Sequence, residues 1–151
     1  QQGVYVSWEN IDGMWTRYNW EHPALIGAYG MLPGDGVDIP TMERTLMKVY
    51  REWKLHETWG WDFPMLAMCA ARLGKPEMAV DYLLDYPAFD FDACGLVGGG
   101  RAPFPYFPGN GGLLYAVAMM AAGWDGAPSG NAPGFPSKGW VVKHEGLHKA
   151  L

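Results

Sequence analysis

Polar and apolar positions alternate at helical spacing in two segments of this chain, and two other segments are apolar almost all round. After Asp38 the apolar residues recur every three or four positions, which predicts a half-exposed helix reaching Trp53. Residues 63–73 are apolar on nearly every side, which predicts a helix buried on most of its faces. The apolar stripe of the first helix is Met42, Leu46, Val49, Tyr50 and Trp53, and its charged positions are Glu43, Arg44, Lys48, Arg51 and Glu52.

The same two patterns return in the second half of the chain. Residues 76–84 are two-faced again, and residues 111–122 are apolar throughout. Near the N-terminus, a shorter apolar helix is expected to start at Pro23, because proline is tolerated in a first helical turn, and to stop before Pro33. Both halves therefore pair a half-exposed helix with a buried one.

This alternation predicts an all-α fold with an inner and an outer layer of helices, made of about two and a half helical hairpins with long Gly/Pro/Trp-rich loops. Residues 1–151 are expected to form a single domain. The loop segments before the inner helices are 15–22, 58–63 and 101–112, and they meet at one end of the domain if the inner helices run parallel. Short strands are expected only at 4–8 and 140–142.

The amino-acid composition argues against several classes of protein. The chain has 151 residues, of which 49% are hydrophobic and 18% charged, so it is not a disordered segment. No run of 18 apolar residues is free of polar interruption, which argues against a membrane span. A net charge of −5 argues against a nucleic-acid partner. The 21 glycines, 12 prolines and eight tryptophans are more than a plain helical bundle needs.

The two cysteines leave the redox compartment open. Cys69 lies in an apolar run and is expected to be a small buried hydrophobe, whereas Cys94 lies in a glycine-rich loop. A bridge between them is possible but is not implied by a single pair at this spacing.

The segment Thr58-Trp59-Gly60-Trp61-Asp62 carries the first candidate chemistry. Indole faces stack on the CH faces of sugars, and a neighbouring carboxylate can bind hydroxyls or exchange protons. The alternative is structural, because Asp is a favoured helix N-cap and both indoles could fill the core.

Two further segments carry candidate binding groups. In Trp20-Glu21-His22 a carboxylate lies beside an imidazole, although a helix start would also favour Glu21. Tyr106 and Asn110 lie in a glycine-rich stretch before the last helix, where backbone amides could approach an anion or hydroxyl. This stretch lacks the lysine of a phosphate-binding loop.

His144-Glu145-Gly146-Leu147-His148 matches the zinc-protease pattern, which needs two imidazoles one helical turn apart. Gly146 weakens such a helix, and the three residues that follow contain no third ligand. We therefore expect no metal and no cofactor, and a small zinc metallopeptidase stays an alternative.

Several motifs, in their order along the chain, resemble the C-terminal part of the six-hairpin glycosidases, whose catalytic domain is an (α/α)6 toroid. The similarity covers roughly residues 15–125 and is nearest to the bacterial α-L-fucosidase-like branch. The resembling segments are Asn19-Trp20-Glu21-His22-Pro23-Ala24-Leu25, Leu32-Pro33-Gly34, Thr58-Trp59-Gly60-Trp61-Asp62, Ala70-Ala71-Arg72-Leu73-Gly74 and Pro108-Gly109-Asn110-Gly111-Gly112.

The resemblance implies a glycoside hydrolase that cleaves glycosidic bonds with paired carboxylates, and it makes Asp62 and Glu21 the candidate catalytic residues. It departs from the fucosidase-like pattern at two positions: Pro108 replaces an Asp, and Asp62 stands where that pattern has Ser. Fucose specificity is therefore not carried over. The candidate substrate-binding residues are Trp20, His22, Trp59, Trp61, Tyr106 and Asn110.

The expected partner is a carbohydrate, either an oligosaccharide or a glycoside. The chain is expected to be the C-terminal portion of a larger (α/α)6 domain and to pack against a missing N-terminal part or a second copy. A periplasmic or secreted location would follow if it belongs to a bacterial polysaccharide-degrading enzyme. The alternative from another class is a non-catalytic carbohydrate-binding or assembly module.

Overall fold

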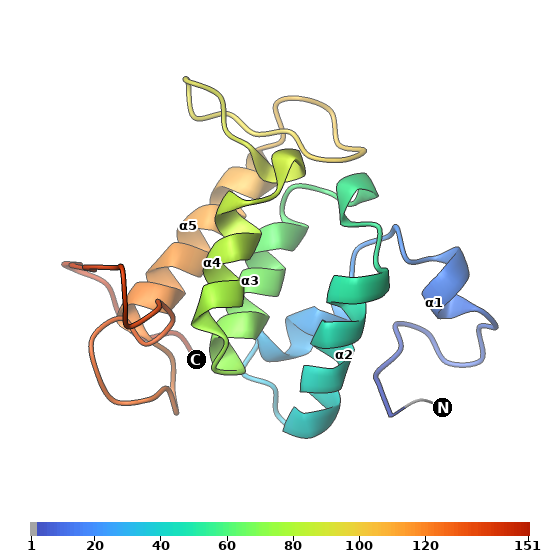
Figure 1. Cartoon of the computed structure of the whole chain (residues 1–151), viewed down its shortest axis with the longest axis horizontal. Coiled ribbons are helices and arrows are strands. Elements are labelled where there is room, and N and C mark those ends of the chain that lie inside the picture. The colour runs from blue at the N-terminus through green and yellow to red at the C-terminus, as the bar shows by residue number, and fades with distance from the viewer. Residues whose placement is uncertain (1–2) are drawn as a thin grey trace.

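The computed structural model describes residues 3–151 and is built from helices joined by long loops (Figure 1). Within these residues, extended pairing is limited to isolated bridges, so the all-α prediction is confirmed and the strands expected at 4–8 and 140–142 are wrong. No helix in this part of the chain is long and apolar enough to cross a bilayer. The helices are α1 (Met14–Arg17), η1 (Ala24–Tyr29), α2 (Ile39–Glu52), η2 (Leu55–Glu57), α3 (Asp62–Arg72), α4 (Pro76–Leu84), η3 (Pro87–Phe89) and α5 (Phe107–Ala122).

Helix α2 forms where the apolar stripe predicts it. The Asp38 side chain caps its start by accepting a hydrogen bond from the Thr41 backbone N–H at 2.9 Å. Two side chains depart from the predicted faces. Tyr50 is half exposed, and Lys48 is almost buried, because its ammonium group lies 5.0 Å from the Trp15 ring centroid and pairs with Glu52.

Helix α3 is the centre of the core, and every residue from Asp62 to Arg72 is buried. Helix α4 returns antiparallel beside it, as the short connection at Gly74 requires. The Lys75 backbone N–H donates to the Ala70 carbonyl at one end of this pair. At the other end, the Tyr86 ring lies 5.1 Å from that of Phe63. The predicted buried and half-exposed helices are thus an adjacent pair.

The first apolar segment is a 3-10 helix rather than an α-helix, and it runs parallel to α3. His22, just before η1, contacts Asp62 at the start of α3. At the opposite end, the Arg72 Nε donates to the Gly30 carbonyl at 2.9 Å. A Cβ on Gly30 would lie 2.9 Å from the Cys69 backbone nitrogen, so the two backbones approach more closely than a larger residue allows.

Helix α5 also runs parallel to α3, with its start at the same end (Figure 1). Gly112 in its second turn faces Pro64, and Trp124, just past its C-terminus, lies 5.7 Å from the Arg72 guanidinium. The remaining long helix, α2, runs the opposite way, since Glu43 at its start pairs with Lys75. The loops before η1, α3 and α5 therefore share one end, as the parallel arrangement predicts.

Helix α5 begins at Phe107, four residues before the predicted start at Gly111, and one side of it is not covered. Leu114 is 72% exposed, and Phe107, Tyr115 and Val117 are exposed as well. The segment contains no charged residue. The prediction that this helix has no polar face is confirmed, but the prediction that it is buried is wrong, because within residues 3–151 no element covers this side of it.

Three successive glycines let the 90–106 loop lie directly on the start of α3. Gly100 pairs with Trp59 in an antiparallel bridge, and Gly99 lies against the Gly60 backbone. A Cβ on Gly100 would overlap the Thr58 carbonyl oxygen, at 1.5 Å. Gly100 also has a φ of +50°, which favours glycine. The loop is placed by backbone contact, for which any side chain is too large.

We predict that Gly100→Ala lowers the free energy of unfolding by about 3 kcal/mol or more, because it combines backbone strain with an overlap that only loop displacement relieves. Gly95→Ala is the matched control, since Gly95 lies in the same loop with a φ of +77° and nothing within 4 Å of its added Cβ. It is expected to cost only about 1 kcal/mol. Urea unfolding followed by circular dichroism measures both, and equal losses would contradict the packing described above.

Candidate functional site

A histidine–aspartate pair lies at the end of the molecule where the three loops meet. The His22 Nδ1 is 2.9 Å from Asp62 Oδ1 and 3.1 Å from Asp62 Oδ2. Asp62 is completely buried, whereas the His22 side chain is 30% exposed. His22 is therefore the member of the pair that a ligand can reach, and Asp62 lies behind it.

Asp62 is not the helix cap that its position suggested. It is the first residue of α3, and Trp61 occupies the N-cap position. Its carboxylate instead accepts a hydrogen bond from the Trp59 backbone N–H at 2.9 Å, outside the helix. This bond and the His22 ring hold the carboxylate in one orientation, which suits a group that positions the imidazole.

Burial raises the pKa of Asp62 to about 6. The Trp59 N–H and the His22 ring act in the opposite direction because both favour the charged carboxylate, while the nearby Glu21 carboxylate adds to the increase. The pKa of Asp62 thus lies well above that of an ordinary carboxyl group, and perturbed carboxyl groups of this kind are common at functional sites.

The His22 Nδ1 has two competing partners, because the Trp61 indole N–H also points at it from 3.1 Å. When Asp62 is charged, Nδ1 carries a hydrogen and donates it to the carboxylate, so the indole loses its acceptor. When Asp62 is protonated, a bare Nδ1 can accept from Trp61. In both forms Nε2 makes no hydrogen bond within residues 3–151 and is left for a ligand.

Aromatic rings surround the imidazole. The rings of Trp59 and Trp61 each lie 5.1 Å from that of His22, centroid to centroid. Tyr106 packs edge-on against Trp59 at 5.5 Å. Burial, and then the charge of Asp62, raises the pKa of Tyr106. The predicted residues Trp59, Trp61 and Tyr106 are thus brought together with His22, and each stays partly exposed.

Glu21 and His22 line the same cavity, of about 350 Å³. Glu21 is held by its backbone, because its carbonyl accepts a 2.7 Å hydrogen bond from the Trp53 indole. Ser7 lies in the same wall but makes no hydrogen bond to His22, so no Ser–His–Asp relay is assembled. The other lining residues are Val6, Trp8, Ala24 and Leu25.

Trp20 lies beside this cluster and is covered by Arg101, a residue that the sequence did not single out. The Arg101 guanidinium carbon is 3.9 Å from the Trp20 ring centroid, and its Nη2 is 2.7 Å from Glu57 Oε2. This cation lowers the pKa of Glu57 through that hydrogen bond. Arg101 therefore ties the 90–106 loop to the two other loops at this end.

Two features that the sequence predicted as functional, Asn110 and the pattern at residues 144–148, are not part of this site. The Asn110 side chain donates to the Gly95 carbonyl at 2.7 Å, and its oxygen is buried without a partner, so it supports the loop instead of facing the cavity. Residues 144–148 form an exposed, irregular segment rather than a helix, so the structural premise of the zinc-protease pattern is wrong. Among residues 3–151, no group of three metal-ligating side chains comes together.

The two cysteines do not form a disulfide. Cys69 is buried and Cys94 is exposed, and both are free.

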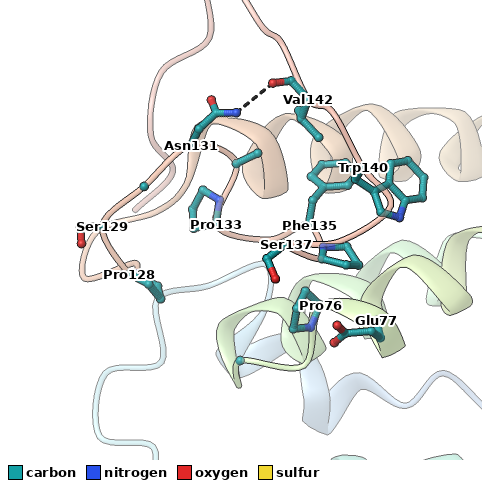
Figure 2. Close-up of a pocket in the computed structure, with 14 residues that line it drawn as sticks. Pro76, Glu77, Pro128, Ser129, Asn131, Pro133, Phe135, Ser137, Trp140 and Val142 are labelled. Atoms are coloured by element: carbon teal, nitrogen blue, oxygen red, sulfur yellow. Dashed lines mark hydrogen bonds between the residues drawn. The ribbon is translucent and has the colours of Figure 1, made fainter.

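A separate cavity of about 530 Å³ lies between the C-terminal loops and the start of α4 (Figure 2). Four prolines and the rings of Phe135 and Trp140 contribute to its wall, and Asn131 braces the loop by donating to the Val142 carbonyl at 2.8 Å. Among the described residues that line it, Glu77 is the one carboxylate and there is no histidine. It therefore offers a single group for proton transfer, whereas the cavity beside His22 offers Glu21 and His22 and is the better candidate.

No protein-family model, no curated protein and no solved structure matches this chain. The similarity to six-hairpin glycosidases therefore stays a prediction from the motifs, and the interpretation of the site depends on its own geometry.

We predict that Asp62 makes stability depend on pH between about 4 and 6. Because its folded pKa of about 6 lies above the unfolded value of 3.8, its contribution is complete at acidic pH and is lost as the pH rises through 6. The full difference is about 3 kcal/mol. The unfolding free energies of wild type and Asp62→Asn, measured from pH 4 to 7, should differ by an amount that changes over this window. Parallel curves for the two proteins would show that Asp62 titrates normally.

We also predict that Arg101→Met loosens the loop over the site. Hydrogen exchange of the 90–106 backbone, measured by mass spectrometry, should become faster by up to about ten-fold because both the ring contact and the ion pair are lost. Arg51→Met is the control, since Arg51 is exposed on α2 and makes no ion pair in the described chain. Unchanged exchange in the Arg101 variant would mean that the glycine contacts alone hold the loop.

Proposed function

We propose that this protein acts on carbohydrate as a glycoside hydrolase, with the site at His22 and Glu21. The observation that carries the proposal is a partly exposed imidazole, backed by the buried Asp62 carboxylate and surrounded by indoles, beside a cavity that Glu21 also lines. The combination supplies both proton-transfer groups and surfaces suited to sugar rings.

The aromatic groups suit a polyhydroxylated ligand with apolar CH faces. Trp8 lines the cavity and is 47% exposed, and Trp59 and Trp61 flank the imidazole. Indole rings offer flat apolar surface at little entropic cost, and the Glu21 carboxylate can accept hydrogen bonds from sugar hydroxyls. Among residues 3–151, one carboxylate and no lysine or arginine line the cavity, which does not favour an anionic ligand.

In this proposal Glu21 and His22 touch the substrate, and Asp62 acts through His22. The motif resemblance made Asp62 and Glu21 the reacting pair, but complete burial keeps the Asp62 carboxylate from a substrate in the cavity. Hydrolysis of a glycosidic bond needs one group to protonate the leaving oxygen and one to activate water or attack the sugar. Glu21 and the Nε2 of His22 are the two groups available for these roles.

The arrangement of the helices supports the same proposal. The parallel elements η1, α3 and α5 are connected through the antiparallel helices α2 and α4, which is the connectivity of part of an (α/α)6 toroid. The open apolar side of α5 is what such a toroid would cover with a further inner helix. We therefore propose a partial toroid as the finer description of the fold.

The second candidate is a carbohydrate-binding module without catalysis. It is favoured by one observation, namely that Glu21 is the only carboxylate that lines the cavity among the residues described by the structure. Glycosidases usually present two carboxyl groups across the scissile bond. A site with one accessible carboxylate and several rings could bind a sugar and leave it intact.

We predict that the protein hydrolyses at least one member of a panel of 4-nitrophenyl glycosides, and that Glu21→Gln and His22→Gln each lower kcat by about 100-fold or more. Asp62→Asn should lower kcat and shift the pH profile, since it changes only the group behind the imidazole. Release of nitrophenol from pH 4 to 8 measures these effects. Glu9→Gln is the matched control, because Glu9 is an exposed carboxylate outside the cavity.

Calorimetric titration with oligosaccharides separates the two candidates. Binding by wild type without turnover of any glycoside would favour the binding module. Hydrolysis that survives in both the Glu21 and His22 variants would show that the catalytic groups lie elsewhere. Neither binding nor turnover by wild type would contradict both candidates.

A further inference from the structure

A second cavity with distinct chemistry lies between α2 and α4, away from His22. It has a volume of about 270 Å³ and is lined by three tyrosines, two aspartates and one methionine. The aspartates and two of the tyrosines come from consecutive turns of α4 and its C-terminal end, and the third tyrosine comes from α2. The lining residues are Tyr50, Met78, Asp81, Tyr82, Asp85 and Tyr86.

The three tyrosine rings form a connected aromatic group. Tyr82 stacks on Tyr86 with a centroid distance of 5.7 Å and an angle of 19°, and Tyr50 meets Tyr82 edge-on at 6.4 Å. The faces of aromatic rings carry negative potential and attract cations, most strongly where water is partly excluded. Tyr82 is buried beneath its neighbours, whereas the rings of Tyr50 and Tyr86 keep exposed surface at the cavity and favour a positively charged ligand.

The two carboxylates strengthen that preference. Asp81 and Asp85 lie one helical turn apart, and neither side chain makes an ion pair or hydrogen bond within residues 3–151. Within the described part of the chain, no lysine, arginine or histidine lines the cavity. Burial, and then the charges of Tyr50, Asp81 and Asp85, raises the pKa of Tyr86. The charge at this cavity is thus negative and lacks a matching cation.

The Tyr82 hydroxyl is not available to a ligand in this cavity. Tyr82 is only 1% exposed, and its hydroxyl is buried without a hydrogen-bond partner among residues 3–151. The groups that a ligand can reach are therefore the carboxylates of Asp81 and Asp85 and the rings of Tyr50 and Tyr86, which keep exposed surface.

We propose that this cavity binds an alkylammonium group, with the rings of Tyr50 and Tyr86 and the carboxylates of Asp81 and Asp85 holding the charge. The volume is suited to a short aliphatic chain with its amine rather than to a whole sugar or nucleotide. Such a group can come from a free aliphatic amine or from a lysine side chain of another protein. The inference does not depend on the proposed carbohydrate function.

The test is an NMR titration of the full chain, following the tyrosine ring resonances. The probes are n-butylammonium, its neutral analogue n-butanol, and Nα-acetyl-lysine methylamide. We expect saturable shifts with both amines and at least ten-fold weaker binding of n-butanol. The tighter of the two amines identifies the source of the ligand. Equal binding of n-butanol, or no saturable binding of either amine, would overturn the proposal.

Variants test the assigned groups. The double change Asp81→Asn with Asp85→Asn should weaken n-butylammonium binding by about ten-fold or more, whereas Asp35→Asn with Asp90→Asn removes the same charge from exposed positions outside the cavity and should not. Tyr50→Leu should weaken binding and Tyr50→Phe should preserve it, because phenylalanine keeps the ring. An equal loss in both aspartate pairs would overturn the proposal, because it would mean that net charge alone attracts the amine.

Discussion

The contact between His22 and the buried Asp62 carboxylate is the interaction on which the organisation of this end of the molecule depends. It joins the segment before η1 to the first residue of α3, and the Trp59 N–H joins the preceding loop to the same carboxylate. A carboxylate with no exposed surface is costly unless it is paired, so the loops that supply its partners are held in place by that requirement. The contacts that stabilise the buried carboxylate are therefore the same contacts that hold the loops in place.

Backbone contacts hold the 90–106 loop at the same end of the molecule. Gly99 and Gly100 bring the 90–106 loop against Gly60 and Thr58, and this loop leads to Tyr106, whose ring closes the aromatic group around His22. The glycine content that looked excessive for a helical bundle thus has a local use. Close approach of two loop backbones leaves the aromatic side chains to face outward, where they can meet a ligand.

The helices that have strong patterns could be predicted from sequence, and the side-chain contacts could not. The apolar spacing of residues 42–53 and the apolar run at 63–73 locate α2 and α3 well, because burial of an apolar face dominates helix formation. The early start of α5 at Phe107 was missed because proline and glycine suggested a loop there. The gathering of residues 20–22, 58–62 and 100–106 followed from the parallel inner elements. That Asp62 faces His22 rather than the amides of its own helix depends on a partner 40 residues away, which a local pattern cannot reveal.

The parallel course of α3 and α5 has an electrical consequence. Peptide dipoles add along a helix and leave partial positive charge at its N-terminus. Since both helices begin at the end that holds His22 and Glu21, their fields reinforce each other there instead of cancelling, as they would in an antiparallel pair. This field favours ionised carboxylates and opposes the effect of burial on Asp62. The parallel direction of α3 and α5 thus contributes to the charge state of Asp62, the first residue of α3.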